Sequence, residues 1–114
     1  MSKVVLQFNT NYMKTLKLMT RSFGDIPELR ACFADACMLH TKDPYTKKFH
    51  DDFTRDLEQE HIDKIFNSDA SVLESGQVLA AVNIQEVYTR CTNDERQILW
   101  GNLQELCRTS SIVT

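Results

Sequence analysis

The chain has 114 residues, of which 42% are hydrophobic, and a formal net charge of −3 from 13 basic and 16 acidic side chains. This length closes one hydrophobic core and is too short for two, so we expect a single domain over residues 1–114. The excess of acid excludes general attraction to a nucleic-acid backbone. Lys14, Lys17 and Arg21 share one helix face and are explained as the solvated side of an amphipathic helix.

The N-terminal segment contains an apolar run that is too short for a secretory signal. No segment reaches the length of about 18 apolar residues that a membrane span needs. We therefore expect a protein of the cytosol or nucleus that is not secreted and whose cysteines stay reduced. The residues from Val4 to Phe8 favour an extended conformation, which predicts an extended arm over residues 1–8 that stays single or pairs between subunits.

Two helices are predicted in the first part of the chain. Asn9 or Thr10 caps the first helix, Gly24 ends it, and its apolar stripe consists of Tyr12, Leu16, Met19 and Phe23. The second helix begins at Pro27, whose missing N–H is harmless at the first helical position, and runs to about Thr41.

Asp43 and Pro44 repeat this start signal and predict a third helix. Its apolar stripe recurs at steps of four residues: Tyr45, Phe49, Phe53 and Leu57. The charged stretch 56–63 leads into further apolar positions, which belong either to this helix or to a separate short one. Turn-forming residues follow over 67–76.

The segment from Val78 to Cys91 has almost no residue that breaks a helix and keeps helical apolar spacing, so it predicts a helix central to the core. Thr92 and Glu95 form a capping box that starts the last helix, and residues 109–114 read as an uncapped tail. Together these elements predict an all-α fold, a compact bundle of about five to six helices with a short extended N-terminal arm.

Cysteine and histidine side chains are the candidates for metal binding. Cys32, Cys37, Cys91 and Cys107 could surround a metal together with His40. All four cysteines occupy positions of apolar period, where a free cysteine behaves as a small buried hydrophobe. We therefore predict no metal ligands and no cofactor.

No catalytic residues are predicted. His40, His50 and His61 are the only imidazoles, and no nucleophile motif accompanies them. The three glycines are isolated, so the sequence has no phosphate-binding loop. An enzyme is a third alternative, and Cys37 with His40 would be its participants.

Aromatic and leucine stripes are abundant for so small a core, which predicts that one of them binds another chain. The interaction candidates are Tyr45, Phe49, Phe53, Trp100, Leu103 and Leu106. A tryptophan beside a leucine stripe is typical of a core, and an exposed one is typical of a binding hot spot.

Two segments carry a resemblance: FGDIPELRACF, residues 23–33, and NDERQILWGNLQEL, residues 93–106. They cover about a fifth of the chain. Together they resemble short helical proteins of the nucleocytoplasmic large DNA viruses, the iridovirus and phycodnavirus group, which combine a Pro-Glu-Leu helix start with a late Ile-x-Trp-x-x-Leu-x-x-Leu helix. Gly101 departs from the larger residue expected there. The group has no catalytic residues to carry over, and the resemblance implies a viral accessory protein or a virion component.

Two functions follow from these features. The first is a non-catalytic interaction or assembly protein, such as a minor structural component of a viral particle, that buries an apolar helix face against a second copy or another viral or host protein. The alternative is a monomeric host-directed regulator that, like cell-death regulators, captures an amphipathic helix in a groove around Tyr45, Phe49 and Phe53.

Overall fold

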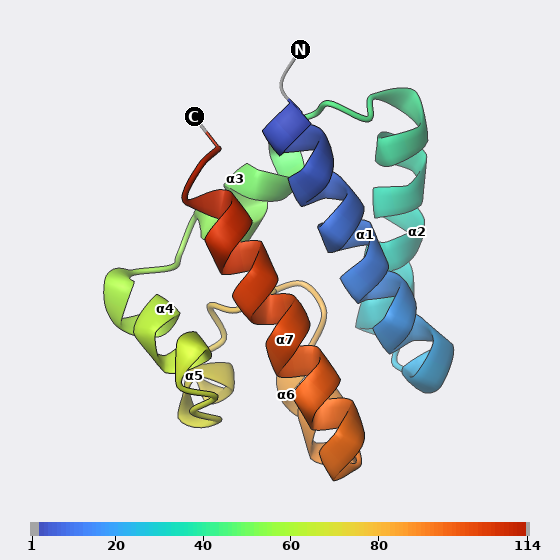
Figure 1. Ribbon diagram of the computed structural model, residues 1–114. Coiled ribbons are helices and arrows are strands. Elements are labelled where there is room, and N and C mark those ends of the chain that lie inside the picture. Colours follow the sequence, from blue (N-terminus) through green and yellow to red (C-terminus); the bar gives the residue numbers. More distant parts are fainter. Residues whose placement is uncertain (1–2, 114) are drawn as a thin grey trace.

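The computed structural model describes residues 3–113, which form seven helices and no strand. The all-α fold predicted from the sequence is therefore confirmed. The helices are α1 Lys3–Phe23, α2 Pro27–Lys42, α3 Lys48–Thr54, α4 Gln59–Phe66, α5 Ser71–Glu74, α6 Ile84–Arg90 and α7 Asn93–Ser110 (Figure 1).

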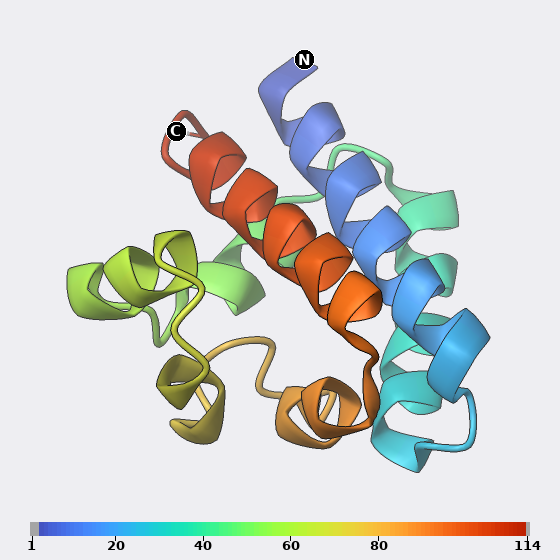
Figure 2. The same ribbon diagram turned by 60° about the horizontal axis from the view of Figure 1, so that its bottom comes forward.

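The two longest helices, α1 and α7, lie side by side and run in opposite directions (Figures 1 and 2). α2 and α3 pack against α1, whereas α4 packs against α7 and α5 contacts both α4 and α6. The described chain therefore begins and ends at the same end of the α1–α7 pair, while the start of α7 lies beside the end of α1 (Figure 1).

The N-terminal arm predicted over residues 1–8 is wrong for the described part of that segment, because α1 already begins at Lys3. The first two residues lie outside the described part. Val5 and Phe8 are buried, and with Tyr12 they extend the apolar stripe of α1 toward its start. Burial of this face outweighs the preference of the neighbouring valines for an extended conformation.

Asn9 lies in the interior of α1 and does not cap it. Its side chain is fully buried, and its Nδ2 donates hydrogen bonds to the carbonyl oxygens of Pro44 and Thr46, both at 2.9 Å. Asn9 therefore fastens the connection between α2 and α3 to the surface of α1.

α2 begins at Pro27, as the sequence predicts, and ends one residue beyond the predicted end. The next helix begins at Lys48 instead of following Pro44 directly. Asp43 Oδ1 accepts a hydrogen bond from the backbone N–H of Tyr45 at 3.1 Å, so the Asp-Pro signal forms a turn rather than a helix start. α3 ends before Leu57, and α4 is a separate short helix.

The long helix predicted from Val78 to Cys91 is also wrong. Residues 78–83 form turns, and only Ile84–Arg90 are helical. Leu79 and Asn83 have positive φ angles of 46° and 52°, which a continuous right-handed helix does not allow. Most large apolar residues of this segment are nevertheless buried, namely Val78, Leu79, Val82, Ile84 and Val87, whereas Ala80 and Ala81 are exposed.

The capping box at the start of α7 is confirmed. Thr92 Oγ1 accepts a hydrogen bond from the backbone N–H of Glu95 at 3.2 Å, and Glu95 Oε1 accepts one from the backbone N–H of Thr92 at 2.8 Å. The tail predicted over 109–114 starts too early, because α7 includes Thr109, whose buried hydroxyl donates to a backbone oxygen of the preceding turn.

Candidate functional site

The structure places five of the six interaction candidates in the core of the single chain. The exposed fraction of each is between 0 and 6%, and these five residues are Phe49, Phe53, Trp100, Leu103 and Leu106. Tyr45 is 38% exposed and lies in the connection before α3. The surface of this fold therefore does not present the stripe that the sequence suggested as a docking face.

Ring packing explains why the aromatic stripe of α3 forms no groove. Phe49 stacks on Tyr12 of α1, with ring centroids 4.9 Å apart and an interplanar angle of 15°. Phe53 packs on Phe8 at 5.8 Å. Because one turn of α3 separates the two phenylalanines, both rings insert into the face of α1, and they are unavailable to a partner.

Trp100 joins α6 to α7. Its ring meets the edge of Tyr88 with centroids 5.6 Å apart, and the guanidinium carbon of Arg96 lies 4.4 Å from the centroid of the same tyrosine ring. Arg96 Nε also donates to the carbonyl oxygen of Tyr88 at 3.0 Å. These contacts give the tryptophan a structural role in the angle between the two helices.

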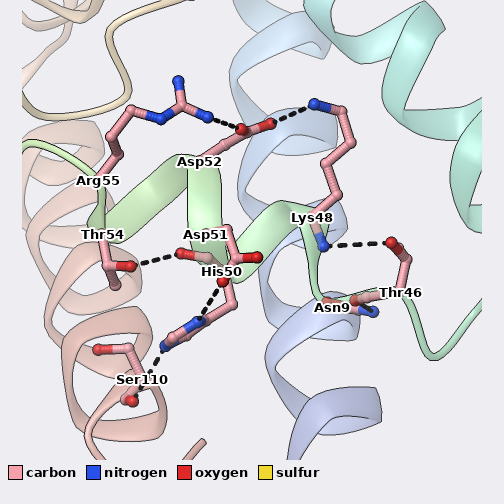
Figure 3. A network of polar contacts seen from close by, with 9 residues as sticks. All are labelled: Asn9, Thr46, Lys48, His50, Asp51, Asp52, Thr54, Arg55 and Ser110. Atoms are coloured by element: carbon pink, nitrogen blue, oxygen red, sulfur yellow. Dashed lines mark hydrogen bonds and ion pairs between the residues drawn. The ribbon is translucent and has the colours of Figure 1, made fainter.

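The three histidines have separate contacts in the fold. His50 Nε2 lies 3.2 Å from the carbonyl oxygen of Ser110 (Figure 3). The His50 ring also packs edge-on against Phe8, with centroids 5.4 Å apart. His61 Nδ1 accepts a hydrogen bond from the backbone N–H of Glu58 at the start of α4. His40 contacts the Phe49 ring, and its buried Nε2 has no partner among residues 3–113.

A polar network surrounds α3. Asp52 forms ion pairs with Lys48, at 3.2 Å, and with Arg55, so both cations share one carboxylate (Figure 3). Thr54 Oγ1 donates to the carbonyl oxygen of His50 one turn earlier. This network links the side chains on the surface of α3 to one another.

A cleft of about 410 Å³ lies between α1, α2 and α3. Tyr12 and Cys32 line it, together with Asp35 and Asp52. Burial is the main cause that raises the pKa of both the Tyr12 hydroxyl and the Cys32 thiol, and the Asp52 carboxylate raises both further. A thiol with a raised pKa stays protonated at neutral pH, so Cys32 is a poor nucleophile and a poor metal ligand.

The thiols also stay apart from other potential ligands. Within the described chain, no group of three or more His, Cys, Asp or Glu side chains is arranged to hold a metal ion. Cys107 is buried in α7, and burial raises its pKa to about 11. Cys107 therefore behaves as a small apolar side chain of the core.

A second hollow is mainly apolar and open to solvent. It has a volume of about 230 Å³ and lies where the end of α1 meets α6 and the start of α7. We call it the α1–α7 groove; its larger apolar side chains and its thiol are Leu18, Met19, Phe23, Cys91, Ile98 and Leu99, and Glu95 adds a carboxylate to the lining. Burial raises the pKa of the Cys91 thiol, so this side chain adds to the neutral lining.

Ile98 is a large apolar residue that is exposed at the edge of this groove. Its side chain is 57% exposed although it borders an apolar hollow. Asn102 lies one turn further along α7 and lines the same groove, with Gly101 beside it. A Cβ atom on Gly101 would meet nothing within 4 Å, so this face of α7 leaves room for another backbone to approach.

Sequence reasoning missed this groove, because its walls come from three helices that are far apart in the sequence. One signal was present. Ile98 precedes Leu99, which belongs to the buried leucine stripe, and the side chains of adjacent helical residues point about 100° apart. A large apolar residue just outside the buried stripe of an amphipathic helix indicates an exposed contact point.

Comparison with known families, with curated proteins and with solved structures found no match to this chain. The resemblance to proteins of large DNA viruses therefore stays a prediction. None of the helices in the described range 3–113 combines the length and the apolar character that crossing a membrane requires.

Proposed function

We propose that this chain is a non-catalytic interaction protein that binds the apolar face of a partner helix in the α1–α7 groove. The observation that carries the proposal is the exposure of Ile98 at the edge of a hollow lined by Leu18, Phe23 and Leu99. Side chains of a helix that enters such a groove at i, i+4 and i+7 would cover Ile98 and fill the apolar space.

Partner binding is better supported than self-assembly through a broad apolar face. The large apolar side chains exposed on the described surface are Met38, Tyr45, Phe66, Ile98 and Ile112. They lie on five different helices or connections, and among them only Ile98 borders the α1–α7 groove. Obligate dimers bury large continuous apolar surfaces, which this scattered distribution does not supply.

The chemistry of the remaining polar groups supports a role without catalysis. His50 and His61 form hydrogen bonds with backbone groups. Burial raises the pKa of the Cys32 thiol, which keeps it protonated. A viral accessory protein or virion component, as the sequence resemblance implies, would use such a groove to hold a viral or host protein.

The proposal is tested by selecting helical peptides of about 18 residues, roughly 27 Å in length, from a displayed library on the purified protein. We expect enrichment of peptides with apolar residues at i, i+4 and i+7. Binding of the enriched peptides should be lost in Ile98→Lys, which places a charge in the groove. Met38→Lys is the matched control, because Met38 is exposed on α2 and does not line the groove.

The outcome of this experiment decides whether the α1–α7 groove binds a helix. Binding that survives Ile98→Lys, or a selection that enriches nothing, would contradict the proposal. Circular dichroism of both variants must show the same helical content as the original protein, so that loss of binding reports on the groove and not on folding.

A further inference from the structure

The two walls of the α1–α7 groove differ in charge. On the α1 wall, Leu18 lies between Lys14, one turn earlier, and Arg21, nearly one turn later. Side chains three and four residues apart are neighbours on a helix surface, so these two cations flank Leu18 along the edge of the groove. The wall on α7 carries Ile98 and Asn102, which are uncharged, and Glu95, whose carboxylate lines the groove one turn before Ile98. The α1 edge is therefore positive, and the α7 wall is negative.

Both cations of the α1 wall are unpaired. Lys14 and Arg21 are exposed, and within residues 3–113 neither forms a hydrogen bond or an ion pair. Other cations of the chain do have partners, as Arg90 has in Asp25 and Arg108 in Glu105. Unpaired charge beside an unfilled apolar groove gives that edge a positive potential that an occupant of opposite charge would complement.

We infer that the occupant of the groove is an amphipathic helix whose apolar stripe is bordered on one side by acidic residues, which pair with Lys14 and Arg21. This inference rests on the proposed function and adds the charge of the partner. Turning a helix end for end in the groove exchanges its two flanks. A helix with a single acidic flank therefore has only one orientation that places its carboxylates beside α1.

Exposed ion pairs contribute modestly to affinity, so the expected effect is limited. Removing two such pairs should weaken binding about 3- to 30-fold, and the loss should shrink at high salt, since salt screens exposed charges. The apolar contacts with Leu18 and Ile98 would remain, and they set the affinity that persists when the charges are removed.

The test uses three synthetic peptides of roughly 18 residues with one leucine stripe and one variable flank. That flank carries glutamate, glutamine or lysine. Each fluorescein-labelled peptide is titrated by anisotropy against the original protein, Lys14→Gln/Arg21→Gln and Lys14→Glu/Arg21→Glu. The control Lys3→Glu/Lys42→Glu makes the same charge change at two exposed lysines, at the start of α1 and at the end of α2, away from Leu18.

We expect the original protein to prefer the glutamate peptide, the Gln variant to lose that preference, and the Glu variant to prefer the lysine peptide. The control should behave as the original protein does.

Equal affinity for all three peptides would overturn the inference of an acidic flank. If Ile98→Lys abolished the binding of all three, the proposed function would still stand. Failure of every peptide to bind would count against both. A dimer by light scattering that Ile98→Lys dissociates would overturn the inference by making a second copy the occupant.

Discussion

The guanidinium of Arg90 is held by the carboxylate of Asp25, with N···O distances of 2.9 and 3.1 Å, so the end of α6 is tied to the connection between α1 and α2. The same guanidinium lies over the ring of Phe23, 5.1 Å from its centroid. Phe23 and Cys91 line the α1–α7 groove. This contact therefore holds together the elements that form one end of the groove.

The Asp25 contact predicts a specific pH dependence. The hydrogen bonds from Arg90 are the main cause that lowers the pKa of Asp25 below its ordinary value of 3.8. A lowered pKa in the folded state means that the carboxylate stabilises the fold above pH 3.8 and that this contribution is lost as the pH falls through the lower folded value. Asp25→Asn should therefore unfold at lower urea concentration than the original protein at pH 7 and at the same concentration in acid.

Arg90→Gln provides the check on this assignment. The double variant Asp25→Asn/Arg90→Gln should be no less stable than Arg90→Gln alone, because Arg90→Gln already removes the contact with Asp25 as well as that with the Phe23 ring. Strictly additive effects of the two changes would show that the residues act independently.

Replacement of Asn9 should destabilise the protein out of proportion to its size. Asn9→Ala removes both hydrogen bonds that hold the α2–α3 connection, at a cost of about 1–3 kcal/mol. Asn11→Ala is the control, since Asn11 lies on the same helix and is partly exposed. Urea denaturation followed by circular dichroism measures the difference, and equal effects of the two changes would contradict the anchoring role.

Replacement by alanine should destabilise the protein strongly at Phe49 and hardly at all at Tyr45. Phe49→Ala removes a buried ring that stacks on Tyr12, and we expect a loss of about 3–5 kcal/mol in the free energy of unfolding. Tyr45→Ala, on the exposed connection, should change it by less than about 0.5 kcal/mol. If Phe49→Ala proved as harmless as Tyr45→Ala, the α3 stripe would again be a candidate binding face.

The capping box of α7 should be worth about 1 kcal/mol, which is the usual cost of replacing such a threonine by alanine. Thr92→Ala removes the oxygen that accepts from the backbone N–H of Glu95. Thr92→Ser keeps this oxygen and should restore most of the stability in thermal unfolding. A serine variant as unstable as the alanine variant would show that the methyl group of the threonine matters instead.

Substitution of Gly101 by alanine should raise the stability of α7 and lower the affinity for a partner helix. Gly101→Ala should stabilise α7 by about 0.5–1 kcal/mol, because alanine is a better helix former and the added Cβ meets nothing within 4 Å. The same methyl group projects from the face beside Ile98 and should weaken the binding of helical peptides selected on the original protein. Unchanged peptide affinity would mean that the occupant does not approach this part of α7.

Local signals in the sequence predicted local structure well. Pro27 opens α2 and the Thr92–Glu95 box opens α7, because a missing N–H and a reciprocal pair of hydrogen bonds act within a few residues of the chain. Asp43 and Pro44 show the limit of this approach. The same pair of residue types serves a turn and a helix start equally well, and contacts with Asn9 from another helix select the turn.

Apolar spacing predicted burial better than conformation. Leu79 is buried, as expected for the central segment 78–91, yet it has a positive φ angle where a helix was predicted. Val5 is buried in a helix where an extended arm was predicted. Side chains from 78–83 reach the core from turns, which apolar periodicity does not distinguish from a buried helix. The sequence marked one exposed contact point, Ile98, but the groove itself could not be predicted, because it exists only where α1, α6 and α7 meet.

The opposite directions of α1 and α7 determine how this molecule would be displayed on a support. Lys3 and Leu18 are separated by 15 residues of one helix, about 22 Å, so a linker attached at either end of the described chain lies far from the groove. A chain tethered by either end would present the groove outward, and many chains tethered side by side would expose their grooves on one common surface. Such an array would bind a partner with several equivalent helices far more strongly than a single chain does.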